Sequence, residues 1–344
     1  MPKTIKVGVV THAQGAHLEA YFTALAQTEE AAEVVLADPS GQTVQRAEKG
    51  LKDKLTKVYP DTDTMLRQEK PQLALVSMEA AQAPPAIDAA LEAGCHVFAE
   101  KPACVRVADF EKLARKAEMK HRYLMLALAN RVHAPVQEAR RLIQEGKLGN
   151  IHAANIFLVA DQTRLRRPDY QKSWFASKER AGGGHLIWLG IHWLDLAMYL
   201  TGLSVAEVAA FTANVGGQPV DIEDSAAVAL RFDSGIVGTM LSGYYLDKGY
   251  HSHLQIWGEH GWLKLQATED LPLEWYSAKD NPNPQVQRFA YPKGQRGYTP
   301  FVRAAVRACA GLQETPITTA DSLRVLRTIF AAYDAARTGQ ARKV

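Results

Sequence analysis

The sequence predicts an α/β protein: a doubly wound parallel sheet near the N-terminus, then an α+β part with an open, mainly antiparallel sheet. In the first part, short apolar runs alternate with amphipathic helical patterns, as in parallel strands joined by helices. Further along, strand-like runs follow one another directly, which is typical of antiparallel sheets. The 344 residues also exceed what one compact core usually needs. We expect domains at 1–125 and 126–344, with the C-terminal helix packing back on the first domain.

The first domain is predicted from buried strands and the helices between them. Each strand is a short apolar run, and each helix has an apolar period near 3.6 residues. The expected strands are 6–10, 32–38, 73–77, 96–100 and 123–129. The expected helices are 16–27, 85–94 and 108–120.

The second domain is predicted to begin with one apolar helix, to continue as a sheet, and to end in two helices. The expected helices are 185–200, 300–311 and 319–338. The expected strands are 206–215, 225–232, 235–245, 252–258 and 261–266.

Composition excludes several classes of protein. The net charge is +3 with no basic cluster, so nucleic acid is not an expected partner. The three cysteines, Cys95, Cys104 and Cys309, form no CxxC pair and are expected to be reduced thiols. A strand-like run begins almost at Met1, which leaves no room for a signal peptide, and no apolar run is long enough to span a membrane. We expect a cytoplasmic protein.

The stretch "VVTHAQGAH" (9–17) lies where a dinucleotide-binding loop should follow the first strand. The three glycine positions of such a loop fall on Thr11, Ala13 and Ala16, and Gly15 is displaced from the pattern. Threonine suits the first position poorly, because β-branched residues resist a positive φ. Alone, the loop favours an ordinary strand-to-helix turn.

The following helix would still present free N–H groups and a positive dipole end to a phosphate. His12 and Gln14 are the side chains expected to replace the lost backbone contacts. Asp38 ends the second strand, where an acid accepts a hydrogen bond from the ribose 2′-OH and repels a 2′-phosphate. The alternative for Asp38 is a plain turn at 38–41. Loop and acid together predict a nucleotide site that prefers NAD over NADP.

"VFAEKPACV" (97–105) puts Lys101 at the carboxyl edge of the parallel sheet, where open α/β folds bind ligands. The stretch resembles the EKP signature of the Gfo/Idh/MocA oxidoreductase family, relatives of glucose–fructose oxidoreductase and inositol dehydrogenase. The resemblance continues through "ALEAGCHVFAEKP", "ANRVHAPVQEARRLIQEGKLGNI", "GGGHLIWLGIHWLD" and "DIEDSAAVALRF", in the family's order and spacing. It implies a Rossmann domain, followed by a domain whose open sheet commonly forms an oligomer interface.

The resemblance also implies residue roles. Lys101 would touch the nicotinamide ribose and the reacting hydroxyl, and His192 would be the acid/base. Alcohol oxidation agrees with this pair, because it needs a base for the O–H proton and a cation beside the developing alkoxide. The remaining residues expected at the cofactor are Ser77, Glu100 and Asn130.

The chain departs from the family at Trp188, where many members carry an acid. Helical spacing would put His185, Trp188, His192, Asp195 and Tyr199 on one face. We interpret Trp188 as a wall of the substrate site, where its ring can lie against a sugar, and Tyr199 as a core residue. His185 could serve as a second proton carrier, and Asp195 could orient or bind a polar group. The fourth residue expected at the substrate is Trp174.

Two other groups leave alternatives open. Arg164, Arg166, Arg167 and Lys172 could attract an anionic substrate such as a uronate or a phosphate, although a solvated basic loop is the favoured interpretation. His251 and His253 alternate on a strand and could bind a metal with His185 and His192. No standard zinc spacing supports this, and we expect no metal.

The leading hypothesis is an NAD-dependent oxidoreductase acting on a secondary hydroxyl of a sugar, cyclitol or glycoside. One alternative is a sugar-cleaving or epimerising enzyme that uses tightly bound NAD transiently. Another is a non-catalytic sensor or scaffold that kept the fold. The expected partners are a carbohydrate-like small molecule and further copies of the chain, as a homodimer or homotetramer through the C-terminal sheet. Neither nucleic acid nor a membrane is expected.

Overall fold

The computed structural model describes residues 3–266, 272–279, 281–289 and 297–344. The chain forms two compact units, which are described separately. The first unit comprises Met1–Ala129, Glu179–Gly182 and Arg296–Leu323; the second comprises Asn130–Lys178, Gly183–Gln295 and Arg324–Val344. The boundary expected after residue 125 therefore lies close to Ala129. The segment 296–323 groups with the first unit, although the sequence placed it in the second domain.

The first unit is built on a six-stranded sheet in the order β3-β2-β1-β4-β5-β6, with every pair parallel. This is the doubly wound order, so the predicted parallel α/β domain is confirmed. Its strands are β1 (Ile5–Thr11), β2 (Ala31–Ala37), β3 (Leu55–Tyr59), β4 (Leu73–Ser77), β5 (His96–Ala99) and β6 (Leu124–Leu126).

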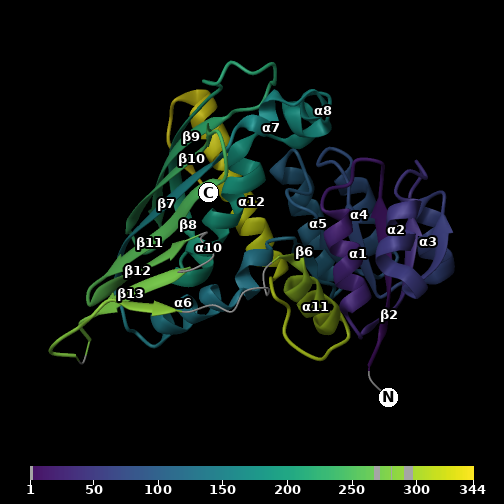
Figure 1. Cartoon of the computed structure of the whole chain (residues 1–344), viewed down its shortest axis with the longest axis horizontal. Coiled ribbons are helices and arrows are strands. Elements are labelled where there is room, and N and C mark those ends of the chain that lie inside the picture. Colours follow the sequence, from purple (N-terminus) through teal and green to yellow (C-terminus); the bar gives the residue numbers. More distant parts are fainter. Residues whose placement is uncertain (1–2, 267–271, 280, 290–296) are drawn as a thin grey trace. The chain divides into compact units, whose positions relative to one another are not determined.

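Helices connect these strands, and several of them are labelled in Figure 1. They are α1 (Leu18–Gln27), α2 (Val44–Leu51), α3 (Thr62–Glu69), α4 (Ala83–Glu92) and α5 (Val107–Met119), with a short 3₁₀ turn at Lys52–Lys54. A further helix of this unit, α11 (Tyr298–Cys309), packs against α1. Sequence analysis missed α2, β3 and α3. The middle of β3 is solvent-exposed, because this strand lies at the sheet edge, so it lacks the apolar run of a buried strand.

The second unit is built on a nine-stranded sheet in the order β14-β13-β12-β11-β7-β10-β9-β8-β15. Among the strand pairs of the described residues, β10–β7 is parallel and the others are antiparallel, so the predicted open, mainly antiparallel sheet is confirmed. Its strands are β7 (Ile151–Asp161), β8 (Val205–Ala213), β9 (Ser225–Phe232), β10 (Val237–Leu246), β11 (Tyr250–Gly258), β12 (Gly261–Gln266), β13 (Leu273–Ser277), β14 (Gln287–Phe289) and β15 (Arg342–Lys343). Sequence analysis missed the central strand β7 and the short strands β13, β14 and β15.

Two of the helices of this unit pack on its sheet: α10 contacts β7, and α6 contacts β12 (Figure 1). The regular helices are α6 (Ala134–Gln144), α7 (Thr163–Arg166), α8 (Pro168–Gln171), α10 (Ile191–Thr201) and most of α12 (Thr319–Thr338). Short turns of this unit are the 3₁₀ segments Ala129–Val132 and Trp174–Ala176 and a π-helical turn at Leu186–Gly190. The short helix α9 (Lys178–Ala181) belongs mostly to the first unit.

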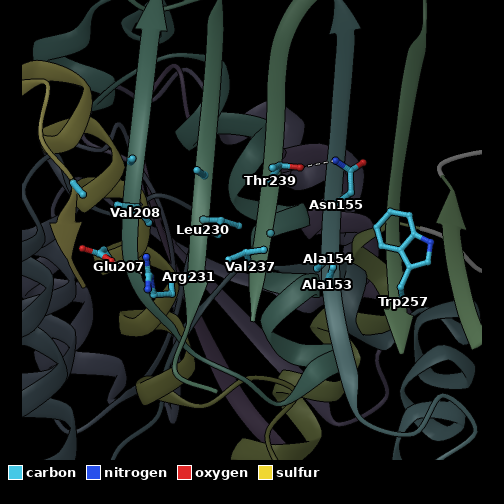
Figure 2. A pocket seen from close by; sticks show the side chains of 14 residues that line it. Ala153, Ala154, Asn155, Glu207, Val208, Leu230, Arg231, Val237, Thr239 and Trp257 are labelled. Atoms are coloured by element: carbon cyan, nitrogen blue, oxygen red, sulfur yellow. Dashed lines mark hydrogen bonds and ion pairs between the residues drawn. The ribbon is translucent and has the colours of Figure 1, made fainter. Parts of the chain in front are cut away.

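The two faces of this sheet differ. We call the face that carries the buried residues Met240, Ser242 and Tyr244 the inner face, and the opposite one the outer face. On the outer face, Val237, Ala153 and Trp257 form one row across three strands. This row lines a shallow hollow of about 500 Å³ (Figure 2).

The described cysteines are all free thiols, and Cys95 donates to the Pro71 carbonyl. Burial raises the pKa of Cys95 to about 11. No helix within the described ranges is both long and apolar enough to cross a membrane.

Candidate functional site

The loop between β1 and α1 is held to β4 by two hydroxyl groups. Thr11 Oγ1 donates to the Ser77 carbonyl at 2.8 Å, and Ser77 Oγ donates to the Ala16 carbonyl at 2.8 Å. Gly15 lies against this pair: a Cβ there would come within 2.1 Å of Thr11 Oγ1. The loop therefore uses its displaced glycine for close packing, and Thr11 is one of the residues that fix its path.

The left-handed position of this loop is His17, at the N-cap of α1, with φ of 58°. Thr11, Ala13 and Ala16 do not have a positive φ. The expected conflict between threonine and a left-handed turn is therefore wrong, because Thr11 still belongs to the extended strand β1. A non-glycine residue in the left-handed region is uncommon and directs attention to His17, which sequence analysis missed.

His17 connects the loop to the end of β5. Its Nδ1 lies 3.0 Å from Glu100 Oε2, and Tyr21 donates to the same carboxylate oxygen. Tyr298, from α11, contacts the His17 ring. Burial raises the pKa of Glu100, but the opposite effect of His17, Lys101 and Tyr21 is larger. The net pKa is therefore below its ordinary value, and the carboxylate is ionised. An ionised Glu100 thus lies beside the N-terminus of α1 and next to Lys101.

Of the two side chains expected to contact phosphate, His12 is already engaged. Its Nε2 accepts from the Glu79 backbone N–H at 3.0 Å, and burial lowers its pKa. Its neutral ring therefore fixes the loop to the segment after β4. Donation to a phosphate by His12 or Gln14 stays a prediction.

Asp38 follows β2 as expected and is buried. One carboxylate oxygen accepts from the N–H and hydroxyl of Ser40, and the other accepts from the N–H and hydroxyl of Thr43. Burial alone would raise the pKa, but these four hydrogen bonds lower it, so Asp38 is ionised. In the structure, the Asp38 carboxylate thus caps the turn that follows β2, as the alternative interpretation of this residue expected. A ribose hydroxyl at Asp38 has to replace the serine or threonine hydroxyl.

Lys101 directly follows Glu100, beyond β5, and is only 2% exposed. Its Nζ lies 4.0 Å from Glu100 Oε1, and the Glu100 N–H donates to the Val76 carbonyl at the end of β4. The neighbouring strands β4 and β5 thus place this lysine at the carboxyl edge of the parallel sheet, as the sequence predicted. Its catalytic role stays a prediction.

In the second unit, the helix that carries His192 begins with a capped, distorted turn. Glu223 accepts from the N–H groups of Gly184 and Leu186 at 2.6 and 2.9 Å, and Tyr333 donates to it at 2.8 Å. A Cβ on Gly184 would come within 2.0 Å of the Glu223 carbonyl. The sequence did not predict Glu223 as a cap, because the contact joins segments far apart in the chain.

The helix expected over 185–200 is a π-helical turn followed by α10. The residues predicted to share one face of this helix differ in how deeply they are buried. Trp188 and His192 are half-buried, whereas His185 and Asp195 are fully buried. Tyr199, expected in the core, is half-buried, with the guanidinium groups of Arg131 and Arg140 over its ring. π-Helical turns are often found at functional sites.

Trp188 belongs to an aromatic cluster. Its ring packs edge to face on Phe175 and on Trp174, with ring centroids 4.6 and 5.6 Å apart. Phe175 in turn stacks with Tyr170, with ring centroids 6.1 Å apart. Trp174 is fully buried and supports Trp188. Substrate contact by Trp188 and Trp174 stays a prediction.

Asp195 forms a buried, two-pronged ion pair with Arg131. Arg131 Nε and Nη2 donate to the two carboxylate oxygens at 2.8 and 2.6 Å. The pair ties α10 to the 3₁₀ turn that also contains Asn130. Asp195 therefore orients Arg131, which agrees with one of its two expected roles. Cofactor binding by Asn130 and substrate binding by Asp195 stay predictions.

His185 is fully buried against the inner face of the sheet. Its Nδ1 lies 2.6 Å from Ser242 Oγ, and its ring packs edge to face on Tyr244 at 4.3 Å. Burial, and then the charge of Arg164, lower the pKa of His185 to about 3. The imidazole is therefore neutral at neutral pH, which argues against the expected second proton carrier.

This depressed pKa predicts an acid sensitivity of the second unit. The unfolded imidazole takes up a proton first, near its ordinary pKa, so stability is complete above that pH and is lost as the pH falls toward about 3. Each pH unit by which the pH falls in this window lowers the free energy of unfolding by about 1.4 kcal/mol through protonation of His185. His185→Gln should flatten the dependence by that slope. All six tryptophans lie in the second unit, so urea unfolding followed by tryptophan fluorescence reports on it alone. Equal pH slopes for the two proteins would contradict the assignment.

The alternative of a metal bound by four histidines is not supported. His251 and His253 pair in register with Val159 and Phe157, whereas Ser242, the partner of His185, pairs with Leu158. Successive residues of a strand point to opposite faces, so the two strand histidines lie on the outer face and His185 on the inner face. The described residues also include no group of three or more side chains that could hold a metal ion.

Comparison with known proteins identifies the family. The profile of the "Oxidoreductase family, NAD-binding Rossmann fold" matches residues 5–128, and that of the "GFO/IDH/MocA C-terminal domain" matches residues 136–264. The chain therefore belongs to the Gfo/Idh/MocA oxidoreductase family, and the resemblance seen in the motifs is confirmed.

Curated relatives include D-glucoside 3-dehydrogenase of Escherichia coli K12, 36% identical over 33% of this chain and 31% of the relative. Myo-inositol 2-dehydrogenase of Thermotoga maritima is 25% identical over 61% of this chain and 62% of the relative. These matches cover less than two thirds of either relative. The crystal structure of an oxidoreductase domain protein from Kribbella flavida has a TM-score of 0.89 and 23% identity, with 99% of each chain covered, and shows the shared fold.

Proposed function

We propose that this chain is an NAD-dependent oxidoreductase that acts on a secondary hydroxyl of a sugar, cyclitol or glycoside. The observation that carries the proposal is the pairing of an NAD-binding family fold with a buried lysine, Lys101, at the carboxyl edge of its parallel sheet. The names of the two curated relatives, a glucoside and an inositol dehydrogenase, support this substrate class.

A bound NAD would accept the hydride from the carbinol carbon. His192 would take the hydroxyl proton as that bond breaks, and Lys101 would donate a hydrogen bond to the developing alkoxide. The products are a ketone, NADH and one proton. On the first unit, the N-terminus of α1 with His17 and the end of β2 with Asp38 are the segments suited to the pyrophosphate and the ribose. The ionised Asp38 favours NAD over NADP, because it repels a 2′-phosphate.

A homo-oligomer through the outer face of the nine-stranded sheet is part of the proposal. Phe211 and Val237 are 80% and 60% exposed, and Trp257 lies in the same row as Val237. Exposed apolar surface of this kind usually marks an interaction site. Light scattering on the full chain should give a mass above that of one chain, and a monomer at micromolar concentration would contradict the proposed oligomer.

The cytoplasmic location is proposed from the free thiols.

The test is a panel of sugars, cyclitols and glycosides with NAD, followed by NADH absorbance and by NMR of the products. We expect at least one compound to give a ketone and an equal amount of NADH. Cleavage or epimerisation without net NADH would instead establish the transient-redox alternative. A protein that binds no nucleotide and converts nothing would be the sensor or scaffold.

A further inference from the structure

We propose that Arg164, on the inner face of the nine-stranded sheet, binds an oxyanion of the substrate, so that the enzyme prefers an acidic or phosphorylated sugar over a neutral one. The inference deepens the proposed function and rests on it for the identity of the ligand as a substrate. It is carried by an unneutralised guanidinium and by buried polar atoms that lie beside it.

The structure separates Arg164 from the rest of the basic loop. Arg166 and Arg167 are exposed; Arg167 pairs with Asp169, and Arg166 donates to Gln162. Arg164 is half-buried and lies over the ring of Tyr244 at 5.4 Å. The solvated-loop interpretation therefore suits its neighbours and not Arg164 itself.

Within the described ranges, no carboxylate lies at ion-pair distance from Arg164. Among the described residues, Arg164 Nη2 donates to the Tyr250 hydroxyl at 2.9 Å. The charge of Arg164 helps to lower the pKa of Asp161. The Asp161 Oδ1 atom, however, accepts hydrogen bonds from the N–H and hydroxyl of Thr163 at the start of α7. A partly buried guanidinium that lacks a counter-ion is costly, and an oxyanion with two oxygens fits its planar donors.

The sheet register places further polar groups beside this guanidinium. Tyr244 and Tyr250 both pair with Ala160, and in the adjacent row of the inner face Ser242 and Ser252 both pair with Leu158. Registered neighbours share a face, so these four side chains surround one patch.

Three buried polar atoms of this patch lack a hydrogen-bond partner among the described residues. They are Tyr244 Oη, Ser252 Oγ and His185 Nε2, the last on a ring whose other nitrogen contacts Ser242. Buried polar atoms are normally paired, so all three are suited to the hydroxyl groups of a bound ligand. His185 is neutral and adds no charge that would repel Arg164.

Aromatic contacts connect this patch to the predicted substrate wall. His185 packs on Tyr244, and it directly precedes the π-helical turn that carries Trp188. A second route runs through Tyr170, which packs against the hydrophobic cluster that includes Tyr244. The Tyr170 ring stacks with Phe175, and the Phe175 ring contacts Trp188 edge to face. A ligand anchored at Arg164 would therefore extend along rings toward the helix of His192.

The experiment compares Arg164→Gln with a matched control, Arg166→Gln, which removes the same charge from an exposed position of the same helix. The full chain, with and without NADH, is titrated by calorimetry with glucuronate, glucose 6-phosphate and glucose. Tryptophan fluorescence during urea unfolding verifies that both variants are folded.

We expect at least one of the two anionic sugars to bind roughly ten-fold to hundred-fold more tightly than glucose, the usual range for a hydrogen bond to a charged group. The preference should disappear in Arg164→Gln and persist in Arg166→Gln. The anion that shows the preference identifies a carboxylate or a phosphate as the recognised group.

Three results would overturn the inference: no anionic sugar binds better than glucose, the preference survives in Arg164→Gln, or both variants lose it equally. The last result would indicate a general field of the basic loop. Failure of the proposed function is a separate outcome, because sugar binding is measured without turnover. A chain that prefers the anion but never binds NADH would retain the subsite and disprove the dehydrogenase.

Discussion

Lys101→Met and His192→Ala are each expected to lower kcat for NAD reduction by about 10²–10⁴-fold, while NADH binding persists. Methionine keeps most of the buried stem of the lysine and removes its charge, and alanine removes the only proposed base on the helix. Steady-state kinetics on the best compound of the panel, with calorimetry of NADH, measures both quantities. Lys112→Met, at an exposed position of α5, is the matched control and should change neither.

The double variant tests whether the two groups act on one hydroxyl. Groups that act as a unit give non-additive losses, so Lys101→Met combined with His192→Ala should lose much less than the product of the single losses. Fully multiplicative losses would mean that the two residues serve separate steps. Unchanged kcat in either single variant would contradict the assignment of that residue.

Asp195→Asn is expected to destabilise the second unit by about 3–5 kcal/mol, because it leaves the buried Arg131 guanidinium without its counter-charge. Urea unfolding followed by tryptophan fluorescence measures this. Replacing both partners, as Arg131→Met with Asp195→Leu, should recover most of the loss, since neither partner then leaves the other's charge buried and uncompensated.

Asp334→Asn, which weakens the partly exposed ion pairs of Asp334 with Arg337 and Arg342, is the control and should cost much less stability than Asp195→Asn. Native stability in Asp195→Asn, together with a raised KM, would contradict the structural role. It would instead support the direct substrate contact that the sequence suggested for Asp195.

The fold could be predicted where local periodicity reflects burial. Strand β4, buried on both faces, and α12, with its 3.6-residue pattern, match the expected ranges. Edge strand β3 is largely exposed and so carries no apolar run. Strand β7 lies at the centre of the second sheet, yet its N-terminal half mixes polar and small residues, so the strand was missed.

Of the candidate site, sequence could locate the residues carried by local motifs, such as Lys101 in "EKP" and Asp38 at a strand end. It could not locate pairings between distant segments: Arg131 with Asp195, His185 with Ser242, or His17 with Glu100. The π-helical turn also changed burial along the helix, so helical spacing alone gave His185 the wrong environment. These features depend on tertiary contacts that no local pattern encodes.

The central claim, a hydride-transferring enzyme of this family built on a loop with a single displaced glycine, depends first on nucleotide binding. The most direct measurement is calorimetric titration of the full chain, stripped of any bound nucleotide, with NADH and with NADPH. We expect saturable binding of one NADH per chain, tighter than that of NADPH because of the ionised Asp38. Absence of binding for both nucleotides would contradict it.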